Sequence, residues 1–196
     1  MLRMWSMLLV GSLVAAATTL AQVRQMESHE HGVAQLMLVL EGELLQVEWE
    51  APSESLVGFE HPPEADADRE VFAQAVQTLT NPERLFVISE EAECLPVGVR
   101  VENTLFKDAA MHQGHEEHED DSEHEHSEEE GHETTHSEFQ AQWRWLCHNP
   151  EAVEAVEIGM LREFPRTEEI RVQWLVHEQQ GAQTLQAGDV IIQGWD

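Results

Sequence analysis

Residues 112–136 constrain the fold of this 196-residue chain more than any other feature of its sequence. These 25 positions contain seven histidines and eleven aspartates or glutamates, and they contain no lysine, arginine or hydrophobic residue. Such a segment cannot bury enough apolar surface to offset the conformational entropy that is lost when a backbone becomes ordered. We therefore expect a disordered loop at 112–136 between two strand-rich halves, residues 22–111 and 137–196.

The first 21 residues have the features of a secretory signal peptide. Arg3 gives a positive start, Met7–Ala17 is largely apolar, and Thr19–Ala21 places small residues at the two positions that a signal peptidase checks. The apolar run is too short for a membrane-spanning helix. We predict cleavage after Ala21 and export of a chain that keeps no membrane anchor.

The charge of the chain excludes some classes of partner. There are 10 lysines and arginines against 39 aspartates and glutamates, a formal net charge of −29. Binding to DNA or RNA needs a basic surface for the phosphates, so nucleic acids are excluded as partners. The same charge argues against docking onto an anionic membrane surface.

Export also affects how the only two cysteines, Cys94 and Cys147, are interpreted. In an oxidising compartment two cysteines most simply form one disulfide. The alternative is that they are thiolate ligands of a metal ion, although oxidation competes with that role.

The hydrophobic pattern predicts an α+β fold built mainly from antiparallel β-sheets, with one helix near residues 64–80. Val33–Leu40 is almost wholly apolar, which is typical of a strand buried on both faces. Glu41-Gly42 predicts a turn into a second strand over 45–50, where apolar and polar residues alternate. Apolar spacings of three and four predict the amphipathic helix over Glu64–Thr80.

The second half alternates as clearly as the first. Residues 139–147 and 170–176 each predict a strand with one apolar face, and Gln180-Gly181 predicts the turn that follows. Shorter strands are expected at residues 85–88, 97–101, 156–160, 183–185 and 190–192.

The histidines of the loop point to metal binding. Imidazole and carboxylate ligands suit Zn²⁺, and also Ni²⁺ or Cu²⁺. With one to five residues between neighbouring histidines, a flexible chain can offer several weak and exchangeable sites. The alternative is a solvated acidic linker in which histidine is incidental. The auxiliary ligands predicted here are His112, His115, His118, His124, His126 and His132, with His136 at the end of the loop.

A second set of histidines lies at the edges of predicted folded elements and could meet around one ion. Three or four nitrogen ligands in tetrahedral geometry would make a plausible zinc site. These histidines are His29, His31, His61 and His136. A single histidine is more often a plain surface residue, as we expect for His148 in a turn and for His177 on the wet face of its strand.

Several motifs in this order resemble the ZrgA family of periplasmic zinc-uptake proteins, over nearly the whole chain that follows the predicted signal peptide. The matching pieces are His29-Glu30-His31-Gly32 before an apolar hairpin, Val57-Gly58-Phe59-Glu60-His61-Pro62, Cys94, the histidine-rich loop, His136-Ser137-Glu138-Phe139 running to Cys147, and Phe164-Pro165.

The resemblance implies a periplasmic zinc-binding protein that works with an inner-membrane, ATP-driven importer. It also implies a disulfide between Cys94 and Cys147, and a high-affinity zinc site outside the loop. The ligand candidates that it suggests are His31, His61 and His136, then His29, with Glu60 as a carboxylate alternative. The loop would be an auxiliary collector of zinc.

The leading hypothesis is that the protein is a monomeric carrier that captures zinc for uptake. Two other functions are alternatives to it. One is a passive metal buffer with no role in transport. The other is an exported zinc-dependent hydrolase, which needs three protein ligands, an open position and a general base. The chain has no His-Glu-x-x-His motif, no Gly-x-Ser-x-Gly motif and no cysteine left over for catalysis if its two are paired. We therefore expect a binding protein and not an enzyme.

Overall fold

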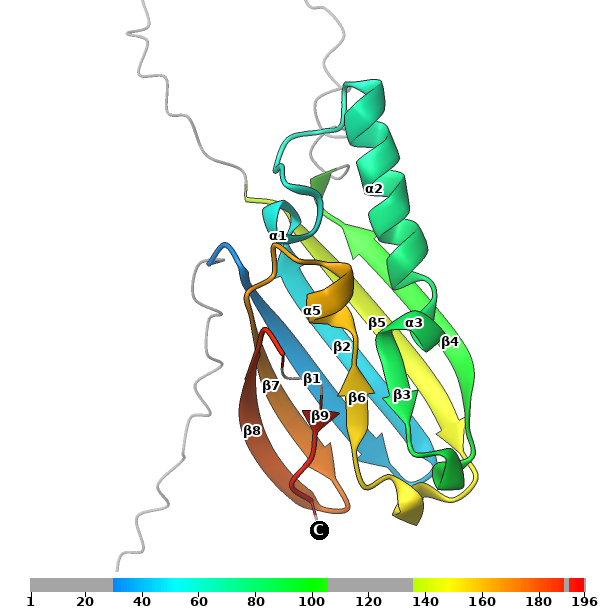
Figure 1. The fold of residues 1–196 in the computed structure, drawn as a ribbon. Coiled ribbons are helices and arrows are strands. Elements are labelled where there is room, and N and C mark those ends of the chain that lie inside the picture. Colours follow the sequence, from blue (N-terminus) through cyan, green and yellow to red (C-terminus); the bar gives the residue numbers. More distant parts are fainter. Residues whose placement is uncertain (1–29, 106–135, 189–190, 196) are drawn as a thin grey trace, which may run out of the picture.

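A computed structural model describes residues 30–105, 136–188 and 191–195 of the chain (Figure 1). A six-stranded sheet forms one layer, and a three-stranded sheet and the helices lie on one of its faces (Figure 1). Strands dominate and most neighbours are antiparallel, so the predicted α+β class is confirmed. The predicted signal peptide and the loop at 112–135 lie outside the described residues. Within the described ranges, no helix is long and apolar enough to cross a membrane.

The large sheet mixes strands from both sides of the histidine-rich segment. Its order is β4-β5-β2-β1-β7-β8, and only the pair β1–β7 is parallel. The two halves of the sequence therefore build one sheet together. The strands are β1 (Val33–Glu41), β2 (Leu44–Pro52), β4 (Cys94–Asn103), β5 (Glu138–Cys147), β7 (Glu169–Val176) and β8 (Gln179–Gln186).

The second layer is made of short elements. Its sheet has the order β3-β6-β9, and the longest helix, α2, matches the predicted helix over 64–80 to within two residues at its start. The strands are β3 (Phe86–Ile88), β6 (Val156–Ile158) and β9 (Ile191–Ile192). The helices are α1 (Ser53–Val57), α2 (Asp66–Leu79), α3 (Pro82–Leu85) and α5 (Met160–Glu163), with 3₁₀ turns η1 (Glu90–Ala92) and η3 (Pro150–Ala152).

The core lies between the two layers. Because side chains alternate across a strand, every second residue of the central strands points toward the helices and the small sheet. Leu38, Val47 and Trp143 are fully buried in this way. The indole Nε1 of Trp143 donates a hydrogen bond of 2.7 Å to the carbonyl of Leu79, which satisfies its only polar atom and fixes the end of α2 over the sheet.

The prediction that Val33–Leu40 is buried on both faces is wrong. Burial alternates along β1, and the outward-facing Met37 is 46% exposed. Within the described residues, the second layer covers only one face of the large sheet (Figure 1). The apolar residues on the other face are shielded partly by their neighbours in the sheet, so their hydrophobicity does not report a second covering layer.

The predicted turn at Gln180-Gly181 is also wrong. The chain turns at His177 and Glu178, which have φ angles of 51° and 63°. Gly181 lies within β8 opposite Trp174, and a Cβ there would be 2.3 Å from Cζ2 of that indole. The glycine is therefore required by the close approach of an aromatic ring, which the sequence pattern does not distinguish from a turn.

Two smaller predictions, for His177 and for the strand over 156–160, are also wrong. His177 lies in this turn and is half-buried, so it is not on the wet face of a strand. Met160 begins α5 instead of ending a strand over 156–160.

The disulfide between Cys94 and Cys147 is confirmed. The two residues are directly opposite each other at the ends of β4 and β5, with an S–S distance of 2.06 Å. The bond therefore fixes the edge strand β4 to the body of the sheet.

Candidate metal centre

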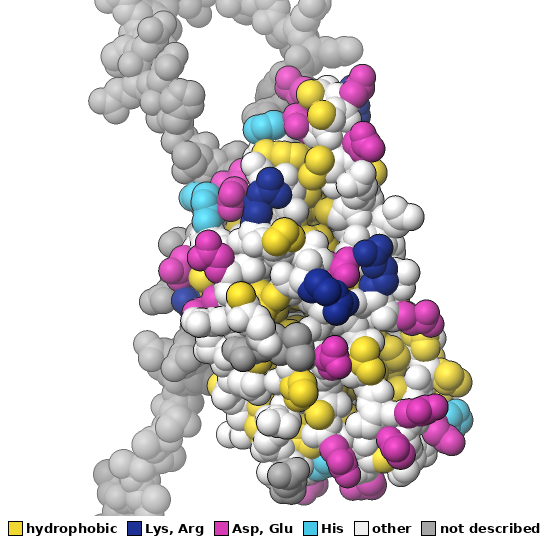
Figure 2. All heavy atoms as spheres, in the orientation of Figure 1, with side chains coloured by type: hydrophobic (Ala, Val, Ile, Leu, Met, Phe, Trp, Pro, Cys, Tyr) yellow, Lys and Arg dark blue, Asp and Glu magenta, His cyan; other side chains and the backbone are white. Residues whose placement is uncertain are grey.

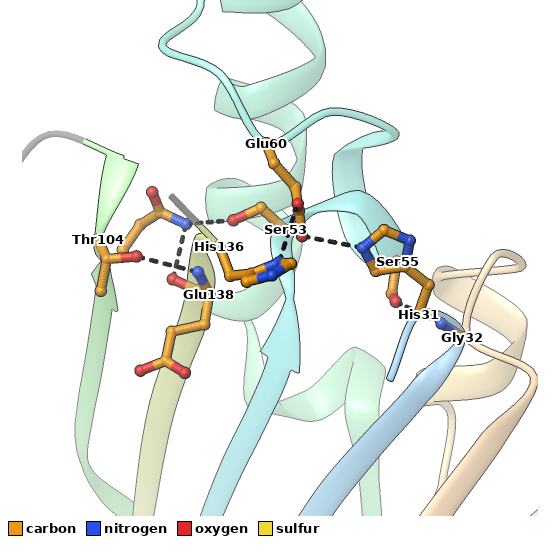
Figure 3. Close-up of polar contacts among 9 residues, drawn as sticks. His31, Gly32, Ser53, Ser55, Glu60, Thr104, His136 and Glu138 are labelled. Carbon is orange, nitrogen blue, oxygen red and sulfur yellow. Dashed lines mark hydrogen bonds and ion pairs between the residues drawn. The ribbon is translucent and has the colours of Figure 1, made fainter. Parts of the chain in front are cut away.

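Three potential ligand atoms converge at the end of the sheet where β1 and β5 begin. They belong to His31, Glu60 and His136, and all lie within 4.8 Å of one another. The Nε2 atom of His31 is 3.2 Å from one oxygen of Glu60, and Nδ1 of His136 is 3.5 Å from the other oxygen. Figure 3 shows the carboxylate between the two imidazole rings.

Gly32 holds His31 in place. Its φ angle of 82° lies in the left-handed region, which glycine adopts without steric penalty. Its amide N–H donates a 2.9 Å hydrogen bond to the buried hydroxyl of Ser55, and its carbonyl accepts from the amide of Glu168 at 2.7 Å. His31 is thus joined to a backbone that α1 and the start of β7 hold on both sides.

Glu60 follows directly from the end of α1. The helix stops at Gly58, which has a φ angle of 86° and donates its amide hydrogen to the carbonyl of Glu54. A Cβ at Gly58 would lie 3.0 Å from Cζ of Arg166, so a larger residue would also displace that side chain. This sharp end of the helix turns the chain so that the carboxylate reaches both imidazoles.

His136 is the last residue of the histidine-rich segment and its only described one, and the next residue is anchored. The carbonyl of Ser137 accepts a 2.8 Å hydrogen bond from the amide of Ser53. The amide of Glu138 donates to the hydroxyl of Thr104 at 3.0 Å (Figure 3). These bonds position the start of β5, and His136 with it, beside α1.

The side chain of Asn103 ties the same two segments together. Its Nδ2 donates to the hydroxyl of Ser53 at 3.0 Å and to the carbonyl of Glu138 at 2.9 Å. Sequence reasoning missed these positioning residues, above all Ser53 and Ser55, which are both fully buried. The available signal was a pair of serines placed directly after a strand, where hydroxyls often bond to neighbouring backbone.

Two imidazole nitrogens and one carboxylate oxygen form a chemically suitable set for zinc. Zinc bonds to such ligands measure about 2.0–2.2 Å in tetrahedral geometry, which places ligand atoms about 3.3 Å apart. The observed separations, up to 4.8 Å, need movements of only about 1–2 Å to reach that geometry. The side chains of His31 and His136 are 52% and 48% exposed, so both have room to make them.

A three-residue set leaves one tetrahedral position open. Ni²⁺ and Cu²⁺ accept the same ligand types, so the donor set does not select zinc by itself. Arg171 of β7 pairs with Glu30, the residue before His31, and with Glu169, at 2.9 Å each. The guanidinium donates hydrogen bonds to Glu30 and to Glu169, and these bonds raise the pKa of Arg171. Its charge is therefore engaged by its own partners.

Among the other predicted ligands, His61 is described by the structure and does not join this group. His61 follows Glu60 but is exposed, its ring stacks on Phe59 at 5.0 Å, and its Nδ1 donates to the carbonyl of Pro62 at 3.1 Å. His29 and the six loop histidines from 112 to 132 lie outside the described residues. His148 is exposed at the far end of β5, and His177 lies 3.8 Å from Glu151.

A family model described as "ZrgA family zinc uptake protein" matches residues 28–193, a span that contains His31, Glu60 and His136. No curated protein matches the chain.

Proposed function

Because the chain belongs to the ZrgA family of zinc uptake proteins, we propose that it captures Zn²⁺ as cargo at the centre formed by His31, Glu60 and His136. The observation that carries this proposal is the convergence itself. The three residues come from the entry to β1, the end of α1 and the entry to β5, which are remote in sequence. Buried serines and positive-φ glycines hold each segment in place.

The exposure of the centre suits capture followed by release. Structural zinc sites are usually closed by four protein ligands, whereas this one has three and leaves a position for water or for a ligand from another molecule. Both histidines are about half exposed, so a competing ligand can approach the ion directly. An incoming ligand at the open position would let zinc leave without unfolding the site.

The place of action that we propose is the periplasm, after export and cleavage behind Ala21. The disulfide between Cys94 and Cys147 supports this, since such bonds persist in oxidising compartments. The receiving partner would be an inner-membrane, ATP-driven importer, and the protein would act as a monomeric carrier, not as an enzyme. The histidines of 112–132 would raise the local concentration of zinc near His136.

The direct test is a zinc titration by calorimetry with a competing chelator. The samples are residues 22–196, the same protein without residues 112–135, and the variants His31→Ala, Glu60→Gln and His136→Ala. We expect one tight site that survives the deletion and is lost or strongly weakened in each variant. His148→Ala is the matched control, because it removes an exposed histidine far from the centre. Loss of all binding on deletion of 112–135 would contradict the proposal.

A second candidate function is a zinc-dependent hydrolase, which the same donor set favours. Two histidines and one carboxylate with an open position are also the ligands of several catalytic zinc sites. The two functions differ in what they need beyond the ligands, because a hydrolase requires a general base next to the bound water. Hydrolysis of ester or peptide substrates that stops on chelation and returns with zinc would favour this alternative over the carrier.

A further inference from the structure

A groove of 580 Å³ opens between β3 and β4 at the end of the molecule opposite the metal centre. We call it the β3–β4 groove. Its apolar lining includes Phe86, Val87, Leu95 and Trp145, and its acidic lining consists of Glu83, Glu90 and Glu93. β3 and β4 are the outer strands of their respective sheets, so two sheet edges face each other across it. Its volume falls within the range of about 300–1,000 Å³ that is typical of ligand pockets.

The groove exposes an unusual amount of apolar side chain. Val87 is 60% exposed and Leu95 is 58% exposed, and these are two of the most exposed large hydrophobic residues in the described chain. The floor is aromatic, because Phe86 and Trp145 meet edge to face with ring centroids 5.2 Å apart. Single exposed apolar residues are common, but apolar walls around a concave aromatic floor are typical of a binding surface.

The walls of the groove are already fixed. The disulfide of Cys94 holds the start of β4, and the backbone amide of His148 donates to the carbonyl of Glu93 at 3.3 Å. The backbone and side-chain amides of Asn149 donate to the carbonyls of Ala92 and Glu91, both at 3.1 Å. An occupant would therefore meet a preformed surface, which reduces the ordering entropy lost on binding.

Apart from His148, the titratable residues that line the groove are all acidic. Glu83, Glu90 and Glu93 are all exposed at its mouth, and its lining includes no lysine or arginine. Figure 2 shows hydrophobic side chains at the lower right of the molecule with acidic side chains around them. The complementary occupant has apolar side chains next to lysine or arginine.

The same acidic charge argues against two other possible occupants, a second copy of the chain and its own histidine-rich segment. A second copy in a two-fold dimer would bring the acidic rim against itself, and such like-charge contacts are unfavourable. The histidine-rich segment of 112–136 contains eleven acidic residues and no lysine or arginine, so it would also be repelled.

Pairing of another strand along the edge of β4 is limited at this end of the groove. Pro96 has no amide hydrogen to donate, and the register of β4 shifts between Pro96 and Gly98. Recognition at the groove therefore depends on side chains and charge more than on an added ladder of backbone hydrogen bonds.

We propose that the β3–β4 groove docks a segment of a partner protein in which apolar side chains are flanked by lysine or arginine. The metal centre lies at the other end of β5, whose ten residues span about 30 Å at about 3.4 Å per residue. A partner in the groove would thus leave His31, Glu60 and His136 accessible. Docking and zinc binding are separate properties and can be tested separately.

The test uses two labelled nine-residue peptides, one that alternates leucine with lysine and one that alternates leucine with glutamate. Fluorescence anisotropy with the full mature protein should show binding of the lysine peptide that weakens with salt, and no binding of the glutamate peptide. Val87→Lys and Leu95→Lys should each weaken binding at least about tenfold, as expected for an anchor in a docking pocket. The control is Met37→Lys, an equal charge change on the open face of the sheet.

Reversing the charge of two glutamates that line the groove tests whether these residues select the peptide. The double variant Glu90→Lys, Glu93→Lys should lose the lysine peptide and gain the glutamate peptide, while unchanged zinc affinity shows that each variant is folded. Equal binding of both peptides, or binding that Val87→Lys and Leu95→Lys leave unchanged, would overturn the proposal. So would a dimer in sedimentation equilibrium that Val87→Lys dissociates, because the occupant would then be a second copy.

Discussion

Zinc should raise the melting temperature of the mature protein through the centre of His31, Glu60 and His136, and not through the histidines of 112–132. The reason is that the stability of the folded protein is measured relative to the unfolded chain. An ion stabilises a fold only to the extent that it binds the folded chain better than the unfolded chain. The centre joins residues that are 29 and 76 positions apart, so the unfolded chain can assemble it only after closing long loops.

The histidines of 112–132 behave differently in this respect. Only one to five residues separate each from the next, so their ligand atoms can reach one ion in the unfolded chain as well. Zinc bound by them should contribute little to the free energy of unfolding, because it is held in both states. The melting temperature therefore separates the two kinds of binding even where a titration sees their sum.

The size of the shift follows from linkage. At free zinc about 100 times above the dissociation constant of the centre, the stabilisation is about 2.7 kcal/mol. For a protein of about 150–250 residues, each kcal/mol changes the melting temperature by about 2–4 °C. We expect a rise of about 5–11 °C between buffer with chelator and buffer with zinc held at that concentration.

Circular dichroism melts of four proteins test this. The mature protein, the protein without 112–135 and the control His148→Ala should all show the rise, and His136→Ala should not. The reasoning is refuted if the rise disappears with 112–135 and persists in His136→Ala, because binding would then be carried by neighbouring histidines and not by the assembled centre.

Three further predictions concern Ser55 beside the metal centre, the pH dependence of zinc binding, and the disulfide. Ser55→Ala leaves the buried amide of Gly32 without its acceptor, so stability should fall by about 1–3 kcal/mol and zinc should bind more weakly; urea denaturation that matches the parent protein would contradict this. Zinc affinity should fall as the pH is lowered from about 7.5 to about 5.5, because protons compete with zinc for two imidazole nitrogens. Titrations in buffers of different ionisation enthalpy should show that protons are released when zinc binds. A zinc affinity that is independent of pH would exclude histidine ligands. Reduction of the disulfide between Cys94 and Cys147 opens a loop of 53 residues and should lower stability by about 4 kcal/mol, measured by denaturation with and without reductant.

Local patterns predicted the secondary structure where one face of an element is buried. The alternation over 139–147 corresponds to β5, and the apolar spacing over 64–80 corresponds to α2. The pattern failed where a residue was chosen for a contact with a distant part of the chain. Gly181 suggests a turn, yet it lies in β8, where a glycine is required because the ring of Trp174 lies over it.

The candidate centre shows the same division. Histidines at the edges of elements were recognised as possible ligands, and His31 and His136 do converge. The choice between the neighbours Glu60 and His61 could not be made from sequence, because it depends on the direction in which the chain leaves α1 at Gly58. That direction places the carboxylate between the two imidazoles and leaves the ring of His61 on Phe59.

The sequence by itself determined the alternating strands, the long helix, the types of ligand available and the pair of cysteines that could bond. These properties follow from backbone periodicity and from the chemistry of single side chains. Only the tertiary structure decided that both halves share one sheet, that the entries to β1 and β5 meet beside α1, and that the edges of β3 and β4 form a groove. Each of these depends on packing between residues far apart in the chain, and no local pattern encodes that packing.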